Sequence, residues 1–278
     1  MKQKSKKTPL VSVLMPAFNA ERYISESIES ILGQTFKDYE LIILNDASTD
    51  TTGEVAKKYA KKYPNVHYYE NTENQNIAES RNILVSKARG KYIAWQDADD
   101  ISVPNRLKLQ VAYLDSHPKV GIVGGFLEFF DENGKKSIRK YAEDDDSLRK
   151  TIFRYSPVAQ PTAMIRAKAL RQAGSYGKDL SPAEDIDMSF RIGQAWNFAN
   201  LSKVTLRYRF HASSNSLKYL KWDELVTIRT RINYALSGRY QLSFFDVLYN
   251  VIQFSTLLFF PATLRVNLFN RIRNSSGL

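Results

Sequence analysis

Cysteine is absent from this chain of 278 residues, and histidine occurs only three times. The absence of cysteine excludes disulfide bonds, thiolate metal sites and a cysteine nucleophile, and it fits a reducing compartment. The chain also lacks a glycine-rich phosphate loop with its lysine, and it lacks the G-x-G-x-x-G turn of dinucleotide-binding proteins. Neither of these two motifs can therefore account for a functional site.

Acidic residues are in the minority, with 29 Asp and Glu against 40 Lys and Arg, for a formal net charge of +11. The imbalance is concentrated in the C-terminal part of the chain. From Lys203 onward eleven basic residues face three acidic ones, a net charge of +8. This asymmetry indicates a polyanionic partner, either nucleic acid or an anionic membrane surface.

The chain has no low-complexity segment, and 43% of its residues are hydrophobic. It is therefore globular, and its length suits one large domain with an appendage, or two domains. We expect a basic tail over residues 1–8, a main domain over 9–215 and a basic, apolar helical extension over 216–278. The N-terminal apolar run is short and contains Pro16, so we interpret it as a first strand rather than as a signal peptide.

Strand-like and helical patterns alternate in the N-terminal half. The expected elements are strands at 11–19, 39–48, 66–71 and 91–100, and helices at 20–34, after Asp50 and at 76–88. This order predicts an α/β fold with a doubly wound, mainly parallel sheet and right-handed crossovers. In such sheets ligands bind beyond the carboxyl ends of the strands, where Asn19, Asp46 and Asp97 are expected.

The second half of the chain has a looser pattern. After a helix starting near Pro104, the expected elements are a hairpin around Asn133-Gly134, a helix at about 145–154, a strand in "PTAMIR", a helix ended by Gly174, a helix in "SPAEDIDMSFRIGQ" and a strand in "KVTLRYRFH". From about residue 217 onward the pattern is helical. The hairpin makes the expected sheet a mixed one.

The stretch "YIAWQDADD" at residues 92–100 runs from buried-strand residues directly into Asp97, Asp99 and Asp100. Crowded carboxylates raise one another's pKa values, and a bound divalent cation removes that cost. Mg²⁺ and Mn²⁺ prefer oxygen ligands, and Mg²⁺ commonly uses one or two carboxylates together with water and substrate phosphate. The alternative interpretation is a solvated acidic turn at the end of a strand.

Three further residues converge on the same expected edge of the sheet. Asp46 ends the second strand, where a carboxylate can accept a hydrogen bond from a base N–H, and Arg81 could neutralise an acid or a phosphate. His211 ends the strand "LRYRFH" and could be a further metal ligand. Taken singly, Asp46 could be a turn acid and His211 a surface or capping histidine. Their common placement at strand ends favours a site.

The chain resembles the family 2 glycosyltransferases of the GT-A fold over about residues 9–212. The motifs that carry the likeness occur in the family's order: "VSVLMPAFNAERYISESIESILGQTF" for the opening strand and helix, "YELIILNDASTDTT" for the nucleotide-binding turn, "NIAESRNILVSKARGKYIAWQDADD" for the segment ending in the D-x-D motif, "SPAEDIDMSFRI" for the catalytic acid and "YRFHASSNS" for the closing histidine. Two positions depart from the family. The turn Asn45-Asp46-Ala47 stands where two acids and a glycine are common, and Gln96 replaces a commonly apolar residue.

The resemblance implies roles for individual residues. Those on the nucleotide-sugar side are the backbone at Pro16 and Ala17, Asn19, the base-contacting Asp46, Arg81 near the base or diphosphate, and Asp97 with Ala98 by the ribose. Asp99 would ligate Mg²⁺ or Mn²⁺, and His211 would approach the metal or the diphosphate. Asp185 would be the catalytic base that takes the acceptor's proton. Because the family inverts at C1, no enzyme nucleophile is required, and Glu184, Asp187 and Arg191 are expected to be structural or acceptor-side residues.

The implied function is transfer of a sugar from a nucleotide donor, with a UDP-sugar favoured over a GDP-sugar, to a hydroxyl of a glycan or lipid-linked acceptor. The setting would be polysaccharide or envelope-glycan synthesis. A catalytically inactive carbohydrate-binding relative and a basic nucleic-acid-binding protein are the alternatives. A nucleotidyltransferase is disfavoured, because "PAFNAERY" has no glycine after the first strand.

Residues 242–260, "LSFFDVLYNVIQFSTLLFF", are rich in Phe and Leu but carry a polar stripe at helical spacing, made of Ser243, Asp246, Asn250, Gln253 and Thr256. The stripe and Pro261 argue against a membrane-spanning helix, which needs about 20 mostly apolar residues. Two arrangements remain: an amphipathic helix lying in a membrane surface, or a helix packed with its apolar face on the enzyme. The first predicts a peripheral protein at the cytoplasmic face of the cell membrane.

Overall fold

The structure is a computed structural model and describes residues 8–131, 134, 136–181, 183–211, 220–261, 264, 265, 268, 269 and 273. Most of the predicted N-terminal tail, Asn133 of the predicted hairpin and the predicted domain boundary near residue 215 therefore lie outside the described residues.

The strands are β1 (Val11–Ala17), β2 (Tyr39–Asn45), β3 (Val66–Glu70), β4 (Tyr92–Trp95), β5 (Ile101–Ser102), β6 (Val120–Asp131), β7 (Lys136–Arg139), β8 (Met164–Arg166) and β9 (Asn197–Phe210). The α-helices are α1 (Ile24–Leu32), α2 (Thr52–Lys62), α3 (Asn76–Lys87), α4 (Arg106–Ser116), α5 (Asp145–Arg149), α6 (Ala167–Ala173), α7 (Glu184–Gly193), α9 (Leu220–Leu236) and α10 (Phe244–Phe259). Two short 3₁₀ helices, η1 (Gln160–Thr162) and η2 (Lys178–Leu180), complete the described elements.

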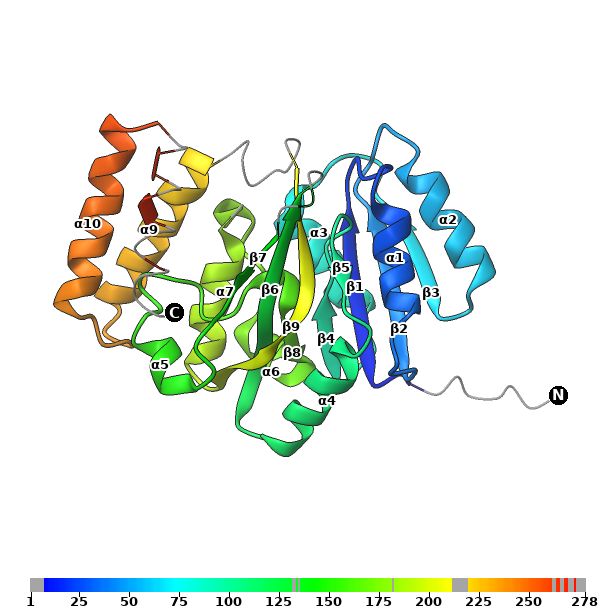
Figure 1. The fold of residues 1–278 in the computed structure, drawn as a ribbon, viewed down its shortest axis with the longest axis horizontal. Helices are drawn as coiled ribbons and strands as arrows, with labels where there is room; N and C mark the ends of the chain where they lie inside the picture. The colour runs from blue at the N-terminus through cyan, green and yellow to red at the C-terminus, as the bar shows by residue number, and fades with distance from the viewer. Residues whose placement is uncertain are drawn as a thin grey trace.

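The nine described strands form one mixed sheet in the order β3-β2-β1-β4-β8-β6-β9-β5, with β7 paired to β6 (Figure 1). Strands β3, β2, β1 and β4 are parallel to one another, and the long β6–β9 pair is also parallel. Strand β8 is antiparallel to both of its neighbours. The predicted α/β fold with a mixed, mainly parallel sheet is confirmed.

Helices cover both faces of the sheet, which explains why its central strands are apolar at nearly every position. Alternate residues of β1 point to opposite faces. Val13 and Met15 pack with Ile28 of α1 in one core, whereas Leu14 packs with Leu84 of α3 in the other. The N-terminal half is thereby built as three layers, with the sheet in the middle.

Two elements differ from the sequence-based expectation. The helix expected at about 145–154 ends at Arg149, after which the chain turns through bonds such as Ile152 N to Arg149 O (3.3 Å). Strand β5 was not expected, because two residues show no periodicity. The hairpin of β6 and β7 is confirmed, and Gly174 ends α6 with a φ of 84°, a conformation that favours glycine.

The carboxyl ends of β1, β2 and β4 meet at the same edge of the sheet. Ala17 is the register partner of Asn45, and Leu14 is the partner of Trp95. The segments that follow these three strands therefore emerge side by side, as expected of a ligand-binding edge.

The C-terminal helices lie at the far side of the molecule from α1 and α2, with α9 packed against α7 and α10 packed against α9 (Figure 1). Trp222 in the first turn of α9 donates its Nε1–H to Ser181 O (3.3 Å), just ahead of α7. Within the described parts of the chain, every helix is too short or too polar to cross a membrane.

Candidate active site

A buried glutamine organises the acidic turn that follows β4. Gln96 Nε2 donates to Asp97 O (3.1 Å) and Asp100 O (2.9 Å), which closes the turn on itself. Gln96 Oε1 accepts from Ser102 Oγ (2.6 Å) and Arg106 Nη1 (3.2 Å). An apolar residue at this position could make none of these bonds, so the departure from the family's usual residue has a structural role.

A fully buried arginine lies close to two of the three acids, Asp97 and Asp100. Burial lowers the pKa of Arg106, in the first turn of α4, to about 10, although Asp100 and Asp97 act against this shift. Burial also raises the pKa of Asp97 to about 6, with Asp99 adding to the shift and with Arg81 and Arg106 opposing it. For Asp100, burial and then Asp99 and Asp97 raise the pKa well above its usual value. The crowding predicted from the sequence is therefore real, and Arg106 offsets part of its cost.

Asp99 and His211 meet at the mouth of this turn. Asp99 Oδ2 lies 3.0 Å from His211 Nε2, and the Asp99 side chain is 33% exposed. The Tyr23 ring packs against the histidine ring with centroids 4.8 Å apart. Arg209 fixes the same region, since its Nε donates to Asp99 O (3.0 Å) and its backbone N–H donates to Asp100 Oδ1 (3.0 Å). The end of β9 is thereby fastened to the turn after β4.

The donor atoms at this point suit a divalent cation that is shared with a substrate. Asp99 offers a carboxylate oxygen, which Mg²⁺ and Mn²⁺ both prefer, and His211 offers an imidazole nitrogen, which a transition metal such as Mn²⁺ accepts more readily than Mg²⁺ does. The described residues contain no group of three or more His, Cys, Asp or Glu arranged to hold a metal unaided. The remaining positions would have to be filled by water and by phosphate oxygens, which is how Mg²⁺ is commonly bound. The pair therefore fits a cation that arrives with a nucleotide diphosphate.

Asp46 lies at the adjoining end of β2, and it is buried and well ordered by hydrogen bonds. Its Oδ1 accepts from Asn71 Nδ2 (2.6 Å) and Gln75 N (3.0 Å), while its backbone N–H donates to Ala17 O (2.8 Å). The next residue, Ala47, has a φ of 57°, a left-handed conformation that glycine adopts more easily. The turn thus keeps the backbone shape of a glycine turn without the glycine.

The loop after β1 is fastened to the loop after β2 through Asn19. Asn19 Oδ1 accepts from Thr49 N (2.9 Å), and its backbone N–H donates to Ser48 Oγ (3.0 Å). Pro16 and Ala17 are buried at the end of β1. In the structure Asn19 therefore shapes the loop, and the same loop sets the position of the Pro16–Ala17 backbone beside Asp46.

Arg81 of α3 reaches across to α7. Its Nη1 donates to Glu184 Oε1, and both residues are buried. The guanidinium lies 5.4 Å from the Trp95 ring and 5.6 Å from the Tyr176 ring, measured to the centroids. Arg81 thus neutralises an acid, which was one of the two roles expected for it. This ion pair holds the start of α7 against α3.

Asp185 follows directly, half-buried in the first turn of α7. Its Oδ1 accepts from Ile186 N (2.8 Å). Burial raises the pKa of Asp185, and Arg81 opposes the shift. Sequence reasoning missed Asp223 of α9, whose pKa is raised to about 7 by burial and then by Asp185 and Glu184. The structure therefore adds a second carboxyl group to the neighbourhood of Asp185.

The other charged residues of α7 are structural. Asp187 accepts from Arg191 Nε (2.8 Å) and from the Tyr234 hydroxyl (2.8 Å), which ties α7 to α9.

The sequence-based prediction of the site also missed Arg106, although the sequence held a signal for it. The first turn of α4 carries no acid and begins with an arginine, an unfavourable charge at a helix N-terminus unless it has a partner.

The chain has clear relatives. A family model described as Glycosyl transferase family 2 matches residues 12–174. The chain is 37% identical over 213 residues to the "Putative glycosyltransferase EpsE" of Bacillus subtilis, covering 76% of each chain. It is 33% identical over 227 residues to the "Uncharacterized glycosyltransferase MJ1057" of Methanocaldococcus jannaschii, covering 80% of this chain and 78% of the relative.

Two solved structures share the fold. Staphylococcus aureus TarS 1-349 in complex with UDP-GlcNAc superposes with a TM-score of 0.68 and 22% identity, over 84% of this chain and 68% of TarS. The mannosyltransferase PcManGT from Pyrobaculum calidifontis, in complex with GDP-Man and Mn²⁺, gives a TM-score of 0.63 and 18% identity, over 97% and 75%. At these identities the likeness concerns the fold, and it confirms the predicted GT-A architecture.

Proposed function

Because this chain belongs to glycosyl transferase family 2, we propose that it transfers a sugar from a UDP-sugar, with inversion at C1, to a hydroxyl of a glycan or lipid-linked acceptor. One observation carries the proposal: Asp46 and the Asp99–His211 pair follow neighbouring strand ends, and the Arg81–Glu184 ion pair brings the start of α7, which carries Asp185, near Asp97. That arrangement suits a donor lying with its base at Asp46 and its diphosphate at Asp99, and an acceptor approaching from Asp185.

In the proposed reaction the acceptor hydroxyl gives its proton to the Asp185 carboxylate while its oxygen forms a bond to C1. The bond between C1 and the diphosphate oxygen breaks, and its electron pair leaves with the diphosphate. Attack from the face opposite the leaving group inverts C1. The raised pKa of Asp185 supports the assignment, since a more basic carboxylate takes a proton more readily than an ordinary aspartate.

Asp99 and His211 would hold Mg²⁺ or Mn²⁺ together with the donor diphosphate. When bound, such a cation neutralises the charge that develops on the departing diphosphate. The Arg209 contacts to Asp99 and Asp100 would keep the carboxylate of Asp99 in place for that task. The presence of Mn²⁺ in the PcManGT complex is consistent with this proposal.

The donor proposal rests on Asp46. Its buried carboxylate can accept a hydrogen bond from the N–H of a uracil, and TarS, which has a similar fold, binds UDP-GlcNAc. A GDP-sugar is the second candidate, because PcManGT, also similar in fold, binds GDP-Man.

We further propose that the enzyme works at the cytoplasmic face of a membrane in polysaccharide or envelope-glycan synthesis, since the basic excess after Lys203 suits anionic lipid.

A thermal-shift screen of sugar nucleotides with Mn²⁺ tests the function, because a ligand that binds only the native state raises the unfolding temperature. We expect UDP-sugars to give the largest shift, and EDTA to abolish it. A shift with GDP-sugars alone would replace the donor. If no sugar nucleotide binds under any metal condition, the chain is an inactive relative and the proposal is wrong.

A further inference from the structure

Helix α10 is amphipathic, but its polar side faces inward. Three residues of the polar stripe predicted from the sequence, Asp246, Gln253 and Thr256, are almost fully buried. Phe244, on the opposite side of the helix, is 75% exposed. Of the two arrangements left open by the sequence, a helix packed through its apolar face is therefore not the one observed.

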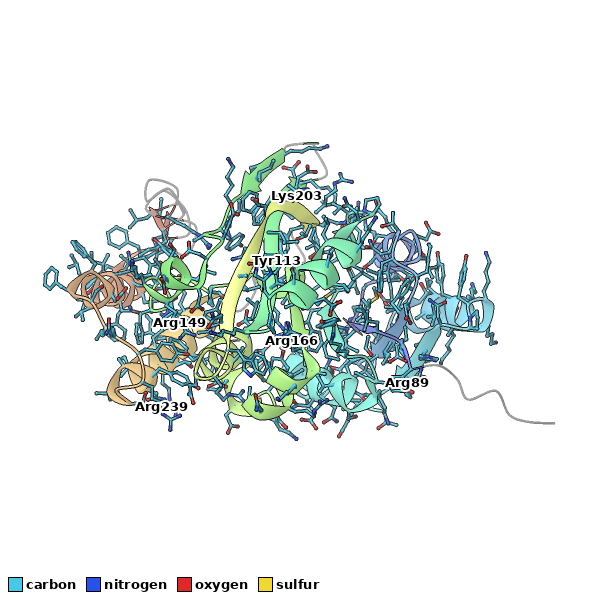
Figure 2. The ribbon with its side chains drawn as sticks, turned by 90° about the horizontal axis from the view of Figure 1, so that it is seen from below. Arg89, Tyr113, Arg149, Arg166, Lys203 and Arg239 are labelled. Carbon is cyan, nitrogen blue, oxygen red and sulfur yellow. The ribbon has the colours of Figure 1, made fainter. Side chains whose placement is uncertain are left out.

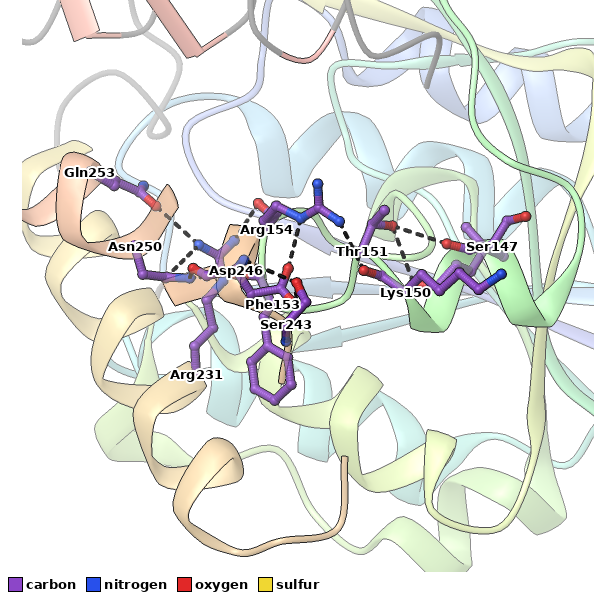
Figure 3. A network of polar contacts seen from close by, with 11 residues as sticks. Ser147, Lys150, Thr151, Phe153, Arg154, Arg231, Ser243, Asp246, Asn250 and Gln253 are labelled. Carbon is purple, nitrogen blue, oxygen red and sulfur yellow. Dashed lines mark hydrogen bonds and ion pairs between the residues drawn. The ribbon is translucent and has the colours of Figure 1, made fainter. Parts of the chain in front are cut away.

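The inward polar side is held by a network of hydrogen bonds to the main domain and α9 (Figure 3). Asp246 Oδ1 accepts from Arg154 Nε (2.7 Å), and Gln253 Oε1 accepts from Arg231 Nη1 (3.0 Å). Asn250 Nδ2 donates to Phe153 O (2.8 Å), and Arg231 Nη2 donates to Arg154 O (2.7 Å). Turning the helix over would take Gln253 away from the buried Arg231 and Asp246 away from Arg154, which is strongly unfavourable. The outward direction of the apolar side is thus fixed.

The outward side continues across α9 to form one apolar surface, which we call the α9–α10 face. Its most exposed members are Leu236 of α9 and Phe244, Phe245, Val251 and Phe259 of α10. A groove of about 770 Å³ between the two helices opens within it. Fifteen of the nineteen exposed large apolar side chains in the described residues occur from Trp222 onward. A concentration of this kind marks an interaction surface rather than ordinary surface composition.

The exposed charges of residues 220–261, the segment that forms this face, all have one sign. Within residues 220–261 the exposed ionisable side chains are Lys221, Arg229 and Arg239. Figure 2 shows Arg239 at the margin of the α9–α10 side. None of the three acids of this segment is exposed: Asp246 bonds Arg154, Glu224 accepts from Arg265 Nη2 (2.7 Å), and Asp223 is half-buried beside α7. An apolar face whose own segment exposes only cations complements an anionic lipid surface, whereas a second copy would oppose like charges.

We propose that the α9–α10 face docks on an anionic lipid bilayer, with the α10 phenylalanines entering the acyl region and Lys221, Arg229 and Arg239 contacting the headgroups. This inference rests on the membrane location proposed above and identifies the surface through which the protein would contact the membrane. Trp222 ties the face to Ser181, close to Asp185, so docking would bring the candidate base near the membrane, where a lipid-linked acceptor carries its hydroxyl.

Vesicle flotation of the full chain tests the proposal, with vesicles of phosphatidylcholine alone or mixed with phosphatidylglycerol. We expect binding to the anionic vesicles that weakens as salt is added. Phe245→Glu and Val251→Glu should each reduce the partition coefficient by about tenfold or more, because each replaces a side chain that would be buried in lipid. Ile138→Glu, on β7, is the matched control and should bind as the wild type does.

Charge reversal supplies a second comparison. Arg229→Glu should weaken binding to anionic vesicles several-fold, whereas Lys58→Glu on the distant α2 should not. All these side chains are exposed, so the fold should persist, and UDP binding by each variant reports it. The proposal is overturned if the wild type does not bind, if Phe245→Glu and Ile138→Glu bind equally, or if sedimentation reveals a dimer that Phe245→Glu separates. Vesicle binding without any nucleotide binding would instead overturn the proposed function and leave the surface intact.

Discussion

The uncharged side chain of Gln96 organises the cluster of charged side chains around it. Its amide closes the Asp97–Asp100 turn, and its carbonyl oxygen accepts from Arg106, which brings a buried cation under the acids. The turn is therefore held in shape by the protein alone. A cation and a diphosphate would add to a preformed arrangement rather than create it.

The first prediction concerns Asp99. Asp99→Ala should abolish transfer while leaving the free energy of unfolding nearly unchanged, because the side chain is partly exposed and the fold does not depend on its burial. Mn²⁺-dependent binding of UDP, measured by calorimetry, should be lost together with activity. Asp146→Ala, an exposed acid on α5, is the control. Full activity of Asp99→Ala in EDTA would contradict the assignment.

The second prediction concerns Asp185. Asp185→Asn should lower kcat by about 10²–10⁴-fold, the usual contribution of a general base, with little change in the Kd of the donor. In the wild type, kcat should fall as the pH drops through the raised pKa of this carboxyl, because only the ionised form can take the proton. Asp187→Asn is the matched control, since the Asp187 carboxylate accepts hydrogen bonds from Arg191 and Tyr234. Near-normal turnover of Asp185→Asn would direct the search to Glu184.

Helices α3, α7 and α9 form a chain of contacts from the acidic turn to the C-terminal helices. Arg81 of α3 pairs with Glu184 of α7, and Asp187 of α7 bonds Tyr234 of α9. The first turns of α7 and α9 place Asp185 and Asp223 near each other. These like charges oppose the packing of the two helix ends whenever both are ionised.

The third prediction follows from that opposition. The pKa of Asp223 in the folded protein is about 7, above its ordinary value near 4, so its contribution to stability is complete at low pH and is lost as the pH rises through about 7. Asp223→Asn should therefore stabilise the protein at pH 8 relative to the wild type by at least about 1 kcal/mol, and very little at pH 4. Urea unfolding at the two pH values measures this. Asp146→Asn should show no such difference, and an equal effect at both pH values would disprove the link to titration.

The sequence predicted the elements well where the signal is local, as in the strand–helix alternation and in the acids at the end of β4. It could not predict which way α10 faces, because the partners of its polar stripe, Arg154 and Phe153, lie more than ninety residues earlier in the chain. The Arg81–Glu184 pair spans 103 residues and was equally hidden. Spacing reveals that a helix has two sides, but only the packing of distant segments decides which side is buried.

The molecule is extended, with the edge of β1 and β2, where we propose that the nucleotide binds, toward one end and α9 and α10 at the other (Figure 1). Asp185 on α7 lies between them. The proposed donor and the proposed membrane therefore approach from different directions, and the two substrates would meet near the middle of the protein. This separation makes the contributions of the two ends measurable one at a time.

The fourth prediction uses this separation. Phe245→Glu should raise the KM for a lipid-linked acceptor presented in vesicles by about tenfold, because less enzyme resides at the surface. The KM for the UDP-sugar and the rate with a water-soluble acceptor should stay unchanged. Initial-rate kinetics with the two acceptors provides the measurement, with Ile138→Glu as control. An equal loss with both acceptors would mean that the variant damages the catalytic domain.

The inverted packing of α10 has a consequence for how this enzyme can change over time. Asp246, Asn250 and Gln253 hold the helix in place, and Phe244 and Phe259 on its outer side are about three-quarters exposed, so they bury little surface on folding. Mutation can therefore alter them freely without a loss of fold. A form of the enzyme that binds membranes and a form that does not would differ by only a few substitutions.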